Sequence, residues 1–435
     1  MLRFGTDGVR GHVGTELTES LVMQLGAAVG REFPRSAIVI AHDGRESGEQ
    51  LLASFAAGAA AQDCVVTSAG LLPTPAVARA AKQRECVGVA ITASHNPWHD
   101  NGVKVFAPGG RKLGDDEQIR IESLWHAHHR ENPGSYWAGN PDPSVADEYV
   151  DWMTESLDLS PFDGREVLFD CANGATSRVA GRVAAGLGLR ADVRDASPDG
   201  RNINHGCGAV HPKKIARECA ARSTIGVAFD GDGDRLIAVD ENGSVVDGDR
   251  IIALLALDMR RREVLTNDTV VVTSMTNLGF HHAMKRGGVS VVTTDVGDRA
   301  VLAAMEEGGF VLGGEQSGHI ISTQHATTGD GLLAALLLLD LVRRSERSLA
   351  EISAEVMQRM PQVLRSVRVT EKPVDIESLL GDDLARERAA LGSDGRIVVR
   401  TSGTEPVVRI MVEAATTEVA QAAVDRLERL VATRT

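Results

Sequence analysis

The sequence predicts an α/β protein with three related α/β domains, each with a mostly parallel mixed sheet, and a smaller C-terminal α+β domain. Short apolar runs rich in Val and Ile alternate with Ala-rich segments of helical period, and this alternation starts three times. Such repeats are typical of βαβ units with helices on both faces of a sheet. The chain has 435 residues, which suits two to four domains.

The first repeat predicts strands at 36–43, 64–70 and 86–94 and helices at 51–62 and 74–83. The second predicts strands at 166–173, 191–197 and 225–230 and a helix at 177–188. The third predicts strands at 269–276 and 290–296 and helices at 278–288 and 299–309. The apolar run 332–339 is too short to span a bilayer and predicts a buried helix.

The C-terminal part follows another pattern. Strands are expected at 364–370, 395–401 and 408–415, and the segment 418–434 is amphipathic with helical period. The Pro- and Gly-rich stretch 131–144 indicates the first domain boundary, either there or one helix later. We therefore expect domains at 1–155, 156–250, 251–363 and 364–435.

Composition narrows the class of protein. The net charge of −14 and the pI of about 5.4 argue against binding to nucleic acid or to an anionic membrane. Five scattered cysteines without a CxxC pair suit a reducing compartment. The N-terminal residues contain no apolar core of signal-peptide length. We expect a soluble cytoplasmic protein.

Polar residues follow the apolar strand that ends at Ile91. The stretch "TASHNPWHDNGVKVF" places Ser94 and His95 just before Pro97. A turn requires the proline but neither of the other two residues, and loops at strand ends often carry chemistry. Taken alone, the pattern fits a nucleophilic serine and a well-capped turn about equally.

Three acids alternate with glycine in "FDGDGDR". Asp230, Asp232 and Asp234 offer the carboxylate oxygens that hard divalent cations prefer, and glycine lets a short loop wrap one ion. A strand precedes the loop and "LIAVD" follows, which excludes an EF-hand. A solvated acidic turn is the alternative, but three adjacent acids repel one another, so we expect a Mg²⁺ site with coordination positions left open for a phosphate.

A glycine-rich segment, "GGEQSGH", carries Glu315, Ser317 and His319. These residues supply an acceptor, a hydroxyl and a titratable ring, which together suit recognition of sugar hydroxyls. A glycine-rich turn with an incidental histidine explains the segment about equally well.

The segment "RTSGTEPVVR" carries Arg400 and Arg409 around two hydroxyls and a glycine. Guanidinium and hydroxyl groups form charge-assisted hydrogen bonds to phosphate. A plain connection between two strands is equally consistent with this segment alone. Together, however, the four motifs are the parts of an enzyme that transfers a phosphoryl group on a sugar phosphate in a central cleft where the domains converge.

The chain resembles the α-D-phosphohexomutases over nearly its whole length, because "TASHNP", "DGDGDR", "GEQSGH" and "RTSGTEP" are similar to that family's four loops, in its order. Four further segments are similar to the subgroup that isomerises glucosamine phosphates: "FGTDGVRG", "CANGAT", "NIN" and "VGDRAVL". Trp98 and His99 depart mildly from the aromatic residue usual in that subgroup.

The resemblance implies that Ser94 is carried as phosphoserine and that a sugar 1,6-bisphosphate, of glucosamine or glucose, is the intermediate and activator. It implies that Mg²⁺ is held by Ser94, Asp230, Asp232 and Asp234. It places Arg10 and His95 beside the phosphoserine, and makes Lys104 and His319 candidates for proton transfer. Substrate would be bound by Arg235, Glu315, Ser317 and His319, and its distal phosphate by Arg400, Thr401, Ser402, Gly403, Thr404 and Arg409.

Other functions stay open at this point. The same machinery could act on mannose or glucose phosphates, release phosphate to water, or serve as a sugar-phosphate sensor. The expected partners are small sugar phosphates and neither nucleic acid nor membrane, and a homodimer is left open.

Overall fold

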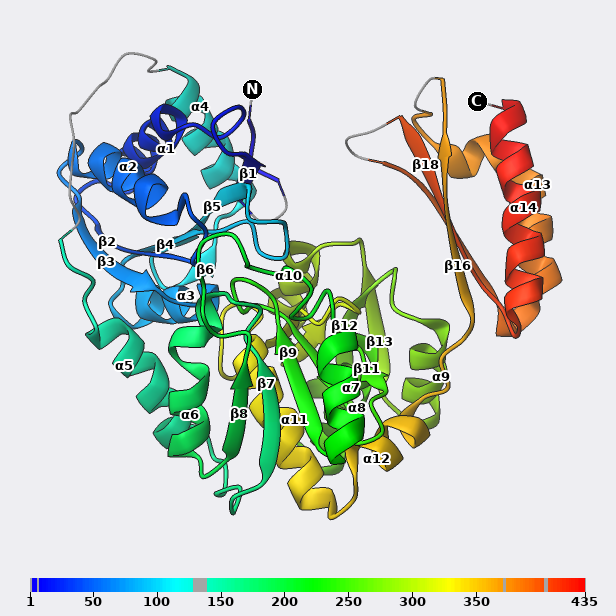
Figure 1. Cartoon of the computed structure of the whole chain (residues 1–435). Helices are drawn as coiled ribbons and strands as arrows, with labels where there is room; N and C mark the ends of the chain where they lie inside the picture. The colour runs from blue at the N-terminus through cyan, green and yellow to red at the C-terminus, as the bar shows by residue number, and fades with distance from the viewer. Residues whose placement is uncertain (1, 6–7, 128–138, 371–372, 403–405, 435) are drawn as a thin grey trace.

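A computed structural model describes residues 2–5, 8–127, 139–370, 373–402 and 406–434 (Figure 1). The first domain is built on a six-stranded sheet of order β1-β5-β4-β2-β3, with β6 paired to β5. Its strands are β1 (Val9–His12), β2 (Ala37–His42), β3 (Val65–Leu71), β4 (Val87–Ile91), β5 (Asp100–Ala107) and β6 (Arg111–Lys112). β2 pairs in parallel with β3 and β4, and β5 runs antiparallel to β4 and β1.

Helices cover both faces of this sheet. Ile38 and Ile40 pack with the helices of one face, and Val39 and Ala41 pack on the other, because successive side chains of a strand point to opposite faces. The first face carries α1 (Glu19–Glu32), α2 (Gly48–Ala60) and α4 (Asp115–Ala127), and the second carries α3 (Thr74–Gln83). α5 (Ser144–Asp151) and a π-helical turn, Trp152–Ser156, then lead toward the second domain.

The second and third domains repeat this plan with fewer strands. The second sheet, β11-β10-β9-β7-β8, comprises β7 (Glu166–Asp170), β8 (Arg190–Arg194), β9 (Ile225–Phe229), β10 (Leu236–Val239) and β11 (Val245–Val246). The third, β13-β12-β14-β15, comprises β12 (Thr269–Thr273), β13 (Ser290–Thr294), β14 (Leu312–Gly314) and β15 (Ile320–Ser322).

All three sheets contain the same arrangement of four strands. Three parallel strands, β3-β2-β4, β8-β7-β9 and β13-β12-β14, are followed by one antiparallel strand, β5, β10 or β15. The hairpin between the third parallel strand and the antiparallel strand contains "TASHNP", "DGDGDR" or "EQSGH". The three motifs therefore occupy equivalent positions in the repeated fold.

One continuous apolar core joins the three domains. It includes Val77 of the first domain, Phe169 and Phe229 of the second, and Leu332 and Leu336 of the third. The helices of these two domains are α6 (Ala180–Gly186), α7 (Lys213–Arg222), α8 (Gly248–Arg261), α9 (Leu278–Arg286), α10 (Asp298–Gly308), α11 (Gly331–Ser345) and α12 (Leu349–Val356), with short 3₁₀ turns at Ala175–Arg178 and Thr266–Asp268. Such a core fixes the three domains relative to one another.

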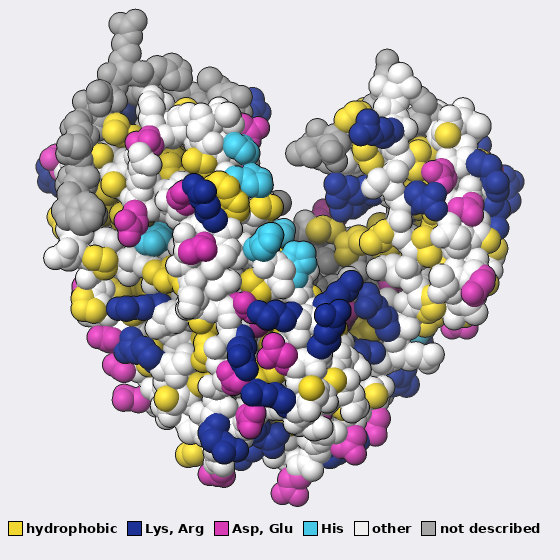
Figure 2. All heavy atoms as spheres, in the orientation of Figure 1, with side chains coloured by type: hydrophobic (Ala, Val, Ile, Leu, Met, Phe, Trp, Pro, Cys, Tyr) yellow, Lys and Arg dark blue, Asp and Glu magenta, His cyan; other side chains and the backbone are white. Residues whose placement is uncertain are grey.

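The C-terminal domain has a core of its own. Its antiparallel sheet, β16-β18-β17, packs against two helices through residues such as Val408, Ile410 and Leu427. The elements are β16 (Gln362–Arg368), α13 (Ile376–Leu391), a 3₁₀ turn Gly392–Asp394, β17 (Arg396–Thr401), β18 (Val407–Glu413) and α14 (Thr417–Arg434). Figure 1 places this domain beyond the third one, and Figure 2 shows the surface hollowed between it and the first domain.

The predicted fold class is confirmed, and so are the helices expected at 74–83, 332–339 and 418–434. The sequence analysis did not anticipate β5 or the helices α1 and α13. Among the described residues, no helix combines the length and apolar character that crossing a bilayer requires. The four domain ranges stay a prediction.

Candidate active site

A cleft of about 650 Å³ lies where the four domains meet. The first domain contributes residues at its N-terminal end and His95, and the second contributes Asp234 and Arg235. The lining consists of Arg3, Gly5, Gly8, Arg10, His95, Asp234, Arg235, Val296, Gly297, Asp298, Glu315, Ser317, His319 and Arg400. The predicted motifs of all four domains therefore line one cavity.

Ser94 is buried in the loop that follows β4, beside the acidic loop of the second domain. Its hydroxyl donates to Asp230 Oδ2 at 2.6 Å, and its Oγ lies 3.4 Å from His95 Nδ1. Gly231 permits this approach, because a Cβ there would lie 2.7 Å from the Ser94 carbonyl oxygen. The strand end and the acidic loop thus bring a hydroxyl and a carboxylate into contact across a domain boundary.

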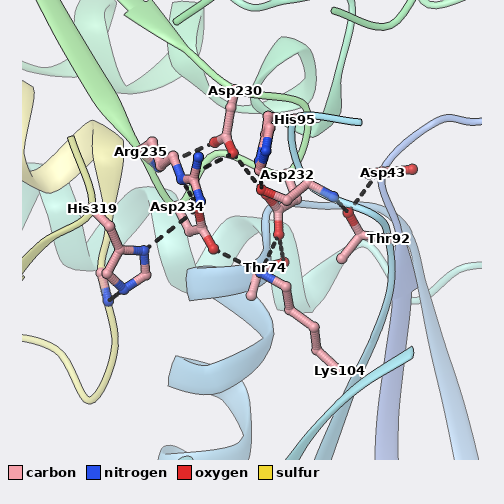
Figure 3. A network of polar contacts seen from close by, with 12 residues as sticks. Asp43, Thr74, Thr92, His95, Lys104, Asp230, Asp232, Asp234, Arg235 and His319 are labelled. Atoms are coloured by element: carbon pink, nitrogen blue, oxygen red, sulfur yellow. Dashed lines mark hydrogen bonds and ion pairs between the residues drawn. The ribbon is translucent and has the colours of Figure 1, made fainter. Parts of the chain in front are cut away.

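The three acids of the loop are buried and converge. One oxygen from each of Asp230, Asp232 and Asp234 lies within 4.8 Å of the others (Figure 3). Lys104 pairs with Asp234 Oδ2 at 2.7 Å and with Asp232 Oδ2 at 2.8 Å, and Thr74 donates to Asp232 Oδ2 at 2.7 Å. β5 supplies Lys104, which the sequence analysis placed among the site residues.

The pKa values of Asp230 and Asp234 are shifted in opposite directions. Burial and the neighbouring Asp234 and Asp232 carboxylates raise the pKa of Asp230 well above its ordinary range. Burial acts in the same direction on Asp234, but Lys104 and His319 outweigh it and hold the pKa of that carboxyl well below its ordinary range. The loop therefore concentrates negative charge that its surroundings only partly compensate.

This donor set fits a hard divalent cation. Besides the three converging carboxylates, Asp232 Oδ1 and Asp234 Oδ1 are buried and have no hydrogen-bond partner among the described residues. Buried anionic oxygens without hydrogen bonds are costly, and a cation would satisfy them better than the longer contacts of Asp234 Oδ1 with His319 and Arg235 do. Three carboxylates also leave coordination positions open for a phosphate oxygen, as Mg²⁺ sites commonly do.

His319, in the third domain, lies against the acidic loop. Its Nδ1 is 3.6 Å from Asp234 Oδ1 and its Nε2 is 3.5 Å from Asp298 Oδ2, while Gly329 N donates to Nε2 at 3.2 Å. Burial acts to lower the pKa of His319, but the Asp234 and Asp298 carboxylates outweigh it and raise the pKa above 6.5. With a proton on Nδ1 alone, the ring faces Asp234 as a donor and accepts from Gly329 N, whereas a second proton, on Nε2, would face Asp298 instead.

The other residues of this loop face the cleft with different exposure. Glu315 is half-buried and accepts from Gly297 N at 3.2 Å, whereas Ser317 is exposed. Arg235 pairs through a β-bridge with His319, and its Nε lies 3.9 Å from both Asp230 Oδ2 and Asp234 Oδ1. The predicted substrate residues thus join the acidic loop to the open part of the cleft.

His95 is the neutral member of the site. Burial, followed by the positive charges of Arg235 and Arg10, lowers the pKa of His95 to about 4. Both of these arginines line the cleft. Near pH 7 the ring is therefore neutral, and it can donate or accept a hydrogen bond beside Ser94 without adding charge to the site.

The C-terminal domain contributes two arginines. Arg400 of β17 and Arg409 of β18 are direct cross-strand partners, and Arg400 lines the cleft. Burial and the charge of Arg409 lower the pKa of Arg400. Like charges opposite each other on a sheet repel, and an anion relieves that repulsion. Thr401 is half-buried and Ser402 buried, while Gly403 and Thr404 lie outside the described residues.

Several residues at the site were not predicted from the sequence. Asp43 and Arg45 follow β2 and reach the Ser94 loop, and Thr74 reaches Asp232 from α3. Lys112 forms an ion pair with Asp298. The polar "HDGR" at the end of a predicted strand was the available signal for the first two, whereas Thr74 and Lys112 stand in segments without one.

A second acidic cluster lies away from the cleft and comprises Asp170, Asp195 and Cys207. Both Asp170 oxygens accept backbone N–H groups, and Asp195 pairs with Lys214 at 2.7 Å. Burial raises the pKa of Cys207 to about 12, so its thiol stays protonated. These groups have their partners already, and no metal is inferred there.

Four domain families match the chain, and all are described as phosphoglucomutase/phosphomannomutase. The α/β/α domains I, II and III match residues 1–131, 147–243 and 247–360, and the C-terminal domain matches 364–430. The chain therefore belongs to the phosphoglucomutase/phosphomannomutase family. It is a phosphohexomutase, an enzyme of the isomerase class.

Curated relatives named phosphoglucosamine mutase match the chain from end to end. The protein of Frankia casuarinae is 44% identical over 449 residues, covering 99% of this chain and 98% of the relative. That of Bacillus licheniformis is 41% identical and covers 98% of both chains.

Solved structures share the fold. A phosphoglucomutase/phosphomannomutase family protein of Burkholderia thailandensis aligns with a TM-score of 0.82 at 25% identity, covering 99% of this chain and 97% of that one. The N-acetylphosphoglucosamine mutase of Aspergillus fumigatus, solved with GlcNAc-6P and magnesium, aligns with a TM-score of 0.72 at 18% identity. It covers 100% of this chain and 96% of that one.

Proposed function

We propose that the enzyme is a phosphoglucosamine mutase, which interconverts glucosamine 6-phosphate and glucosamine 1-phosphate through a phosphoserine at Ser94 and a sugar 1,6-bisphosphate. The observation that carries the proposal is the contact of Ser94 with Asp230 beside the converging acids of Asp232 and Asp234. End-to-end similarity to relatives of that name supports the choice of sugar. The product would feed the synthesis of amino-sugar nucleotides and cell-wall precursors in the cytoplasm.

The reaction consists of two transfers. Phosphoserine gives its phosphoryl group to the C1 hydroxyl of glucosamine 6-phosphate, so the Ser94 O–P bond breaks, a P–O bond to the sugar forms, and the hydroxyl proton passes to a base. The Ser94 oxygen takes up a proton as it leaves. The bisphosphate then turns around and the Ser94 hydroxyl attacks its 6-phosphoryl group: the O6–P bond breaks, the Ser94 O–P bond forms again, and the hydroxyl proton passes to O6 as glucosamine 1-phosphate is released. Of the two candidates for the base, His319 lines the cleft, whereas Lys104 is buried between Asp232 and Asp234. We therefore assign proton transfer to His319 and charge compensation to Lys104.

Mg²⁺ would be held by Asp230, Asp232 and Asp234 together with the phosphoryl group on Ser94. When bound, the ion supplies positive charge that stabilises the transferring phosphoryl group. Arg235 approaches the same acids from the cleft side and adds a second positive group. Arg10 and His95 would contact the phosphoserine from the first domain.

Recognition of the sugar and its distal phosphate falls to the third and fourth domains. Glu315, Ser317 and His319 would hold sugar hydroxyls, and Arg400 and Arg409, with Thr401, Ser402, Gly403 and Thr404, would hold the phosphate that is not reacting. The bisphosphate presents the same groups after it turns, so one clamp serves both orientations. The alternative is a phosphomannomutase/phosphoglucomutase, which the same architecture would also support.

A substrate comparison tests the proposal. The kcat/KM values for glucosamine, glucose and mannose phosphates are measured side by side with Mg²⁺ and a catalytic amount of glucose 1,6-bisphosphate, and inorganic phosphate release is followed in parallel. We expect glucosamine phosphate to be preferred and no stoichiometric release of phosphate. A preference for mannose or glucose phosphate would establish the alternative, and steady phosphate release would indicate a hydrolase.

A further inference from the structure

A buried arginine that the proposed chemistry does not use supports the loop that carries Ser94. Arg45 follows β2, its side chain is fully buried, and its Nε pairs with Asp43 Oδ2 at 2.9 Å. A buried guanidinium is costly unless its N–H groups are paired, so its partners indicate what it is for.

Those partners are backbone carbonyls of one loop. Arg45 donates to the carbonyl oxygens of Ser94 at 2.8 Å, Asn96 at 2.9 Å and Asp100 at 2.9 Å, and also to that of Pro97. Five N–H groups in a fixed planar fork can hold several acceptors at once, and an ammonium group cannot reproduce that arrangement.

The same ion pair also fixes the amide side of Ser94. Ser94 N donates to Thr92 Oγ1 at 2.8 Å, and the Thr92 hydroxyl donates to Asp43 Oδ2 at 2.6 Å. Asn204 of the second domain adds a hydrogen bond to the Ser94 carbonyl at 2.9 Å. Ser94 has a φ of +52°, a conformation that residues with a Cβ rarely adopt without such restraint.

The peptide bond between Ser94 and His95 orients the His95 N–H group for the phosphoryl group that Ser94 is proposed to carry. None of the described peptide bonds is cis, so the His95 N–H points away from the carbonyl that Arg45 holds. Among the described residues this N–H has no hydrogen-bond partner. It is therefore a preoriented donor on the side opposite Arg45, where an oxygen of the phosphoryl group on Ser94 can accept it.

We propose that Arg45 is a positioning residue for phosphoryl transfer: with Asp43 and Thr92 it sets the Ser94 peptide so that the hydroxyl meets Asp230 and the His95 N–H faces the phosphoryl group. This inference rests on the proposed role of Ser94 as phosphoryl carrier. It assigns Arg45 an effect on the transfer step and little effect on substrate affinity.

Arg45→Lys tests the inference, with Arg344→Lys as the matched control. Arg344 also pairs with two acids, Asp258 and Asp340, but lies outside the cleft lining. Each enzyme is loaded with ³²P from labelled glucose 1,6-bisphosphate, the label on Ser94 is quantified, and its transfer to glucosamine 6-phosphate is timed by rapid quench. We expect transfer per labelled Arg45→Lys molecule to slow on the order of 100-fold, KM to change little, and the control to match wild type.

Thr92→Val is the second variant, because it removes the acceptor of Ser94 N while keeping the side-chain shape, and it should slow transfer in the same way. A wild-type transfer rate per labelled Arg45→Lys molecule overturns the inference. A loss of total activity that is explained wholly by a smaller labelled fraction also overturns it. If Arg45→Lys does not fold, a wild-type rate in Thr92→Val overturns it. Wild-type enzyme that takes no label on Ser94 would instead refute the proposed function itself.

Discussion

Ser94 has a left-handed backbone conformation, which for a residue with a Cβ costs about 1–3 kcal/mol. The surrounding structure maintains it, because the Ser94 amide and carbonyl groups have their partners in Thr92, Arg45 and Asn204. Strain held in this way is common at functional sites, since it aims one side chain where a relaxed loop would not. Here it directs the hydroxyl at Asp230.

At the same scale, Asp232→Asn is predicted to weaken Mg²⁺ binding. The substitution removes one of three converging charges while keeping the side-chain shape, so the Mg²⁺ concentration for half-maximal activity should rise at least about tenfold. Asp195→Asn, in the second acidic cluster, is the control and should leave the Mg²⁺ requirement unchanged. Equal Mg²⁺ titrations of Asp232→Asn and wild type would show that the ion binds elsewhere.

The motif residues could be predicted from the sequence because acids, hydroxyls and arginines were grouped in short glycine-containing loops. Thr74 could not, and the polar "HDGR" signals a site without revealing what Asp43 and Arg45 hold, because most of their partners are distant in sequence or are backbone groups. Arg45 acts on carbonyls 49 to 55 residues away, and Thr74 on an acid 158 residues away. Residue type at a single position does not reveal such contacts.

Among the elements, the repeated hairpins explain how three loops of different chemistry reach one cleft. Each hairpin follows the third parallel strand of its sheet, and the antiparallel strand returns the chain to the sheet. In the third domain, a Cβ at Gly318 would lie 2.1 Å from the Leu236 carbonyl oxygen, so glycine allows this hairpin to contact the second domain. The βα pattern predicted the parallel strands of the first two sheets and β12 and β13 of the third, because they are apolar runs, but it missed the short strand β14, Leu312–Gly314.

Two of the elements that the sequence analysis missed, β5 and α13, were missed for identifiable reasons. β5 carries the buried polar residues Asn101 and Lys104, so its sequence does not show the pattern of an ordinary strand. α13 contains Gly381 with non-helical dihedral angles, which interrupts its period. In both, the site or a kink requires residues that the local pattern disfavours.

Helix α8 supports a prediction about pH. Asp249, in its first turn, is fully buried; Oδ1 has no hydrogen-bond partner among the described residues, and Oδ2 accepts from Asn277 N at 2.9 Å. Burial and the nearby Asp247 raise the pKa of Asp249 to about 7. The folded state therefore holds an extra proton between about pH 4 and 7, so this group lowers the stability as the pH rises through that window.

Asp249→Asn should remove that pH dependence. We expect the free energy of unfolding of the variant, relative to wild type, to rise by up to about 4 kcal/mol between pH 4 and pH 8. Urea unfolding at several pH values measures this difference. Asp258→Asn on the same helix is the control, because Arg344 and Arg261 overcome burial and lower the pKa of that carboxyl. Its titration therefore affects stability only below about pH 4, and its difference from wild type should stay flat between pH 4 and pH 8. If the unfolding free energy of Asp249→Asn relative to wild type does not change between pH 4 and pH 8, Asp249 is ionised in the folded state throughout that range.

At the scale of the whole molecule, three domains share one apolar core and the fourth has its own. The phosphoserine, the acidic loop and the sugar loop are thereby fixed together, whereas the phosphate clamp belongs to a separately packed body. The sequence predicted that the four motifs converge, because each falls in a different α/β unit or in the C-terminal part. It did not predict this division, because the shared core depends on side chains that meet across domains.

The clamp should therefore control retention of the intermediate. Arg409→Ala removes a charge-assisted hydrogen bond worth about 1.5–3 kcal/mol, so binding of both monophosphates should weaken roughly tenfold to a hundredfold. Escape of the bisphosphate should leave Ser94 dephosphorylated, so activity should decay during an assay and recover when bisphosphate is added.

Arg365→Ala is the matched control, because Arg365 lies on the neighbouring strand β16 and pairs with Glu428 of α14. It should retain wild-type affinity and steady activity. The contrary result is that Arg409→Ala binds both monophosphates normally and keeps constant activity without added bisphosphate. That result would show that the β17–β18 loop only connects two strands and does not bind the phosphate.

The central claim is that Ser94 carries the phosphoryl group, and intact-protein mass spectrometry tests it most directly. Wild type and Ser94→Ala are each treated with glucose 1,6-bisphosphate and Mg²⁺, weighed and assayed. The account predicts the added mass of one phosphoryl group on wild type, located at Ser94 by peptide mapping, and no such mass and nearly no mutase activity in a folded Ser94→Ala. A phosphoryl group at another residue, or full activity in Ser94→Ala, would contradict it.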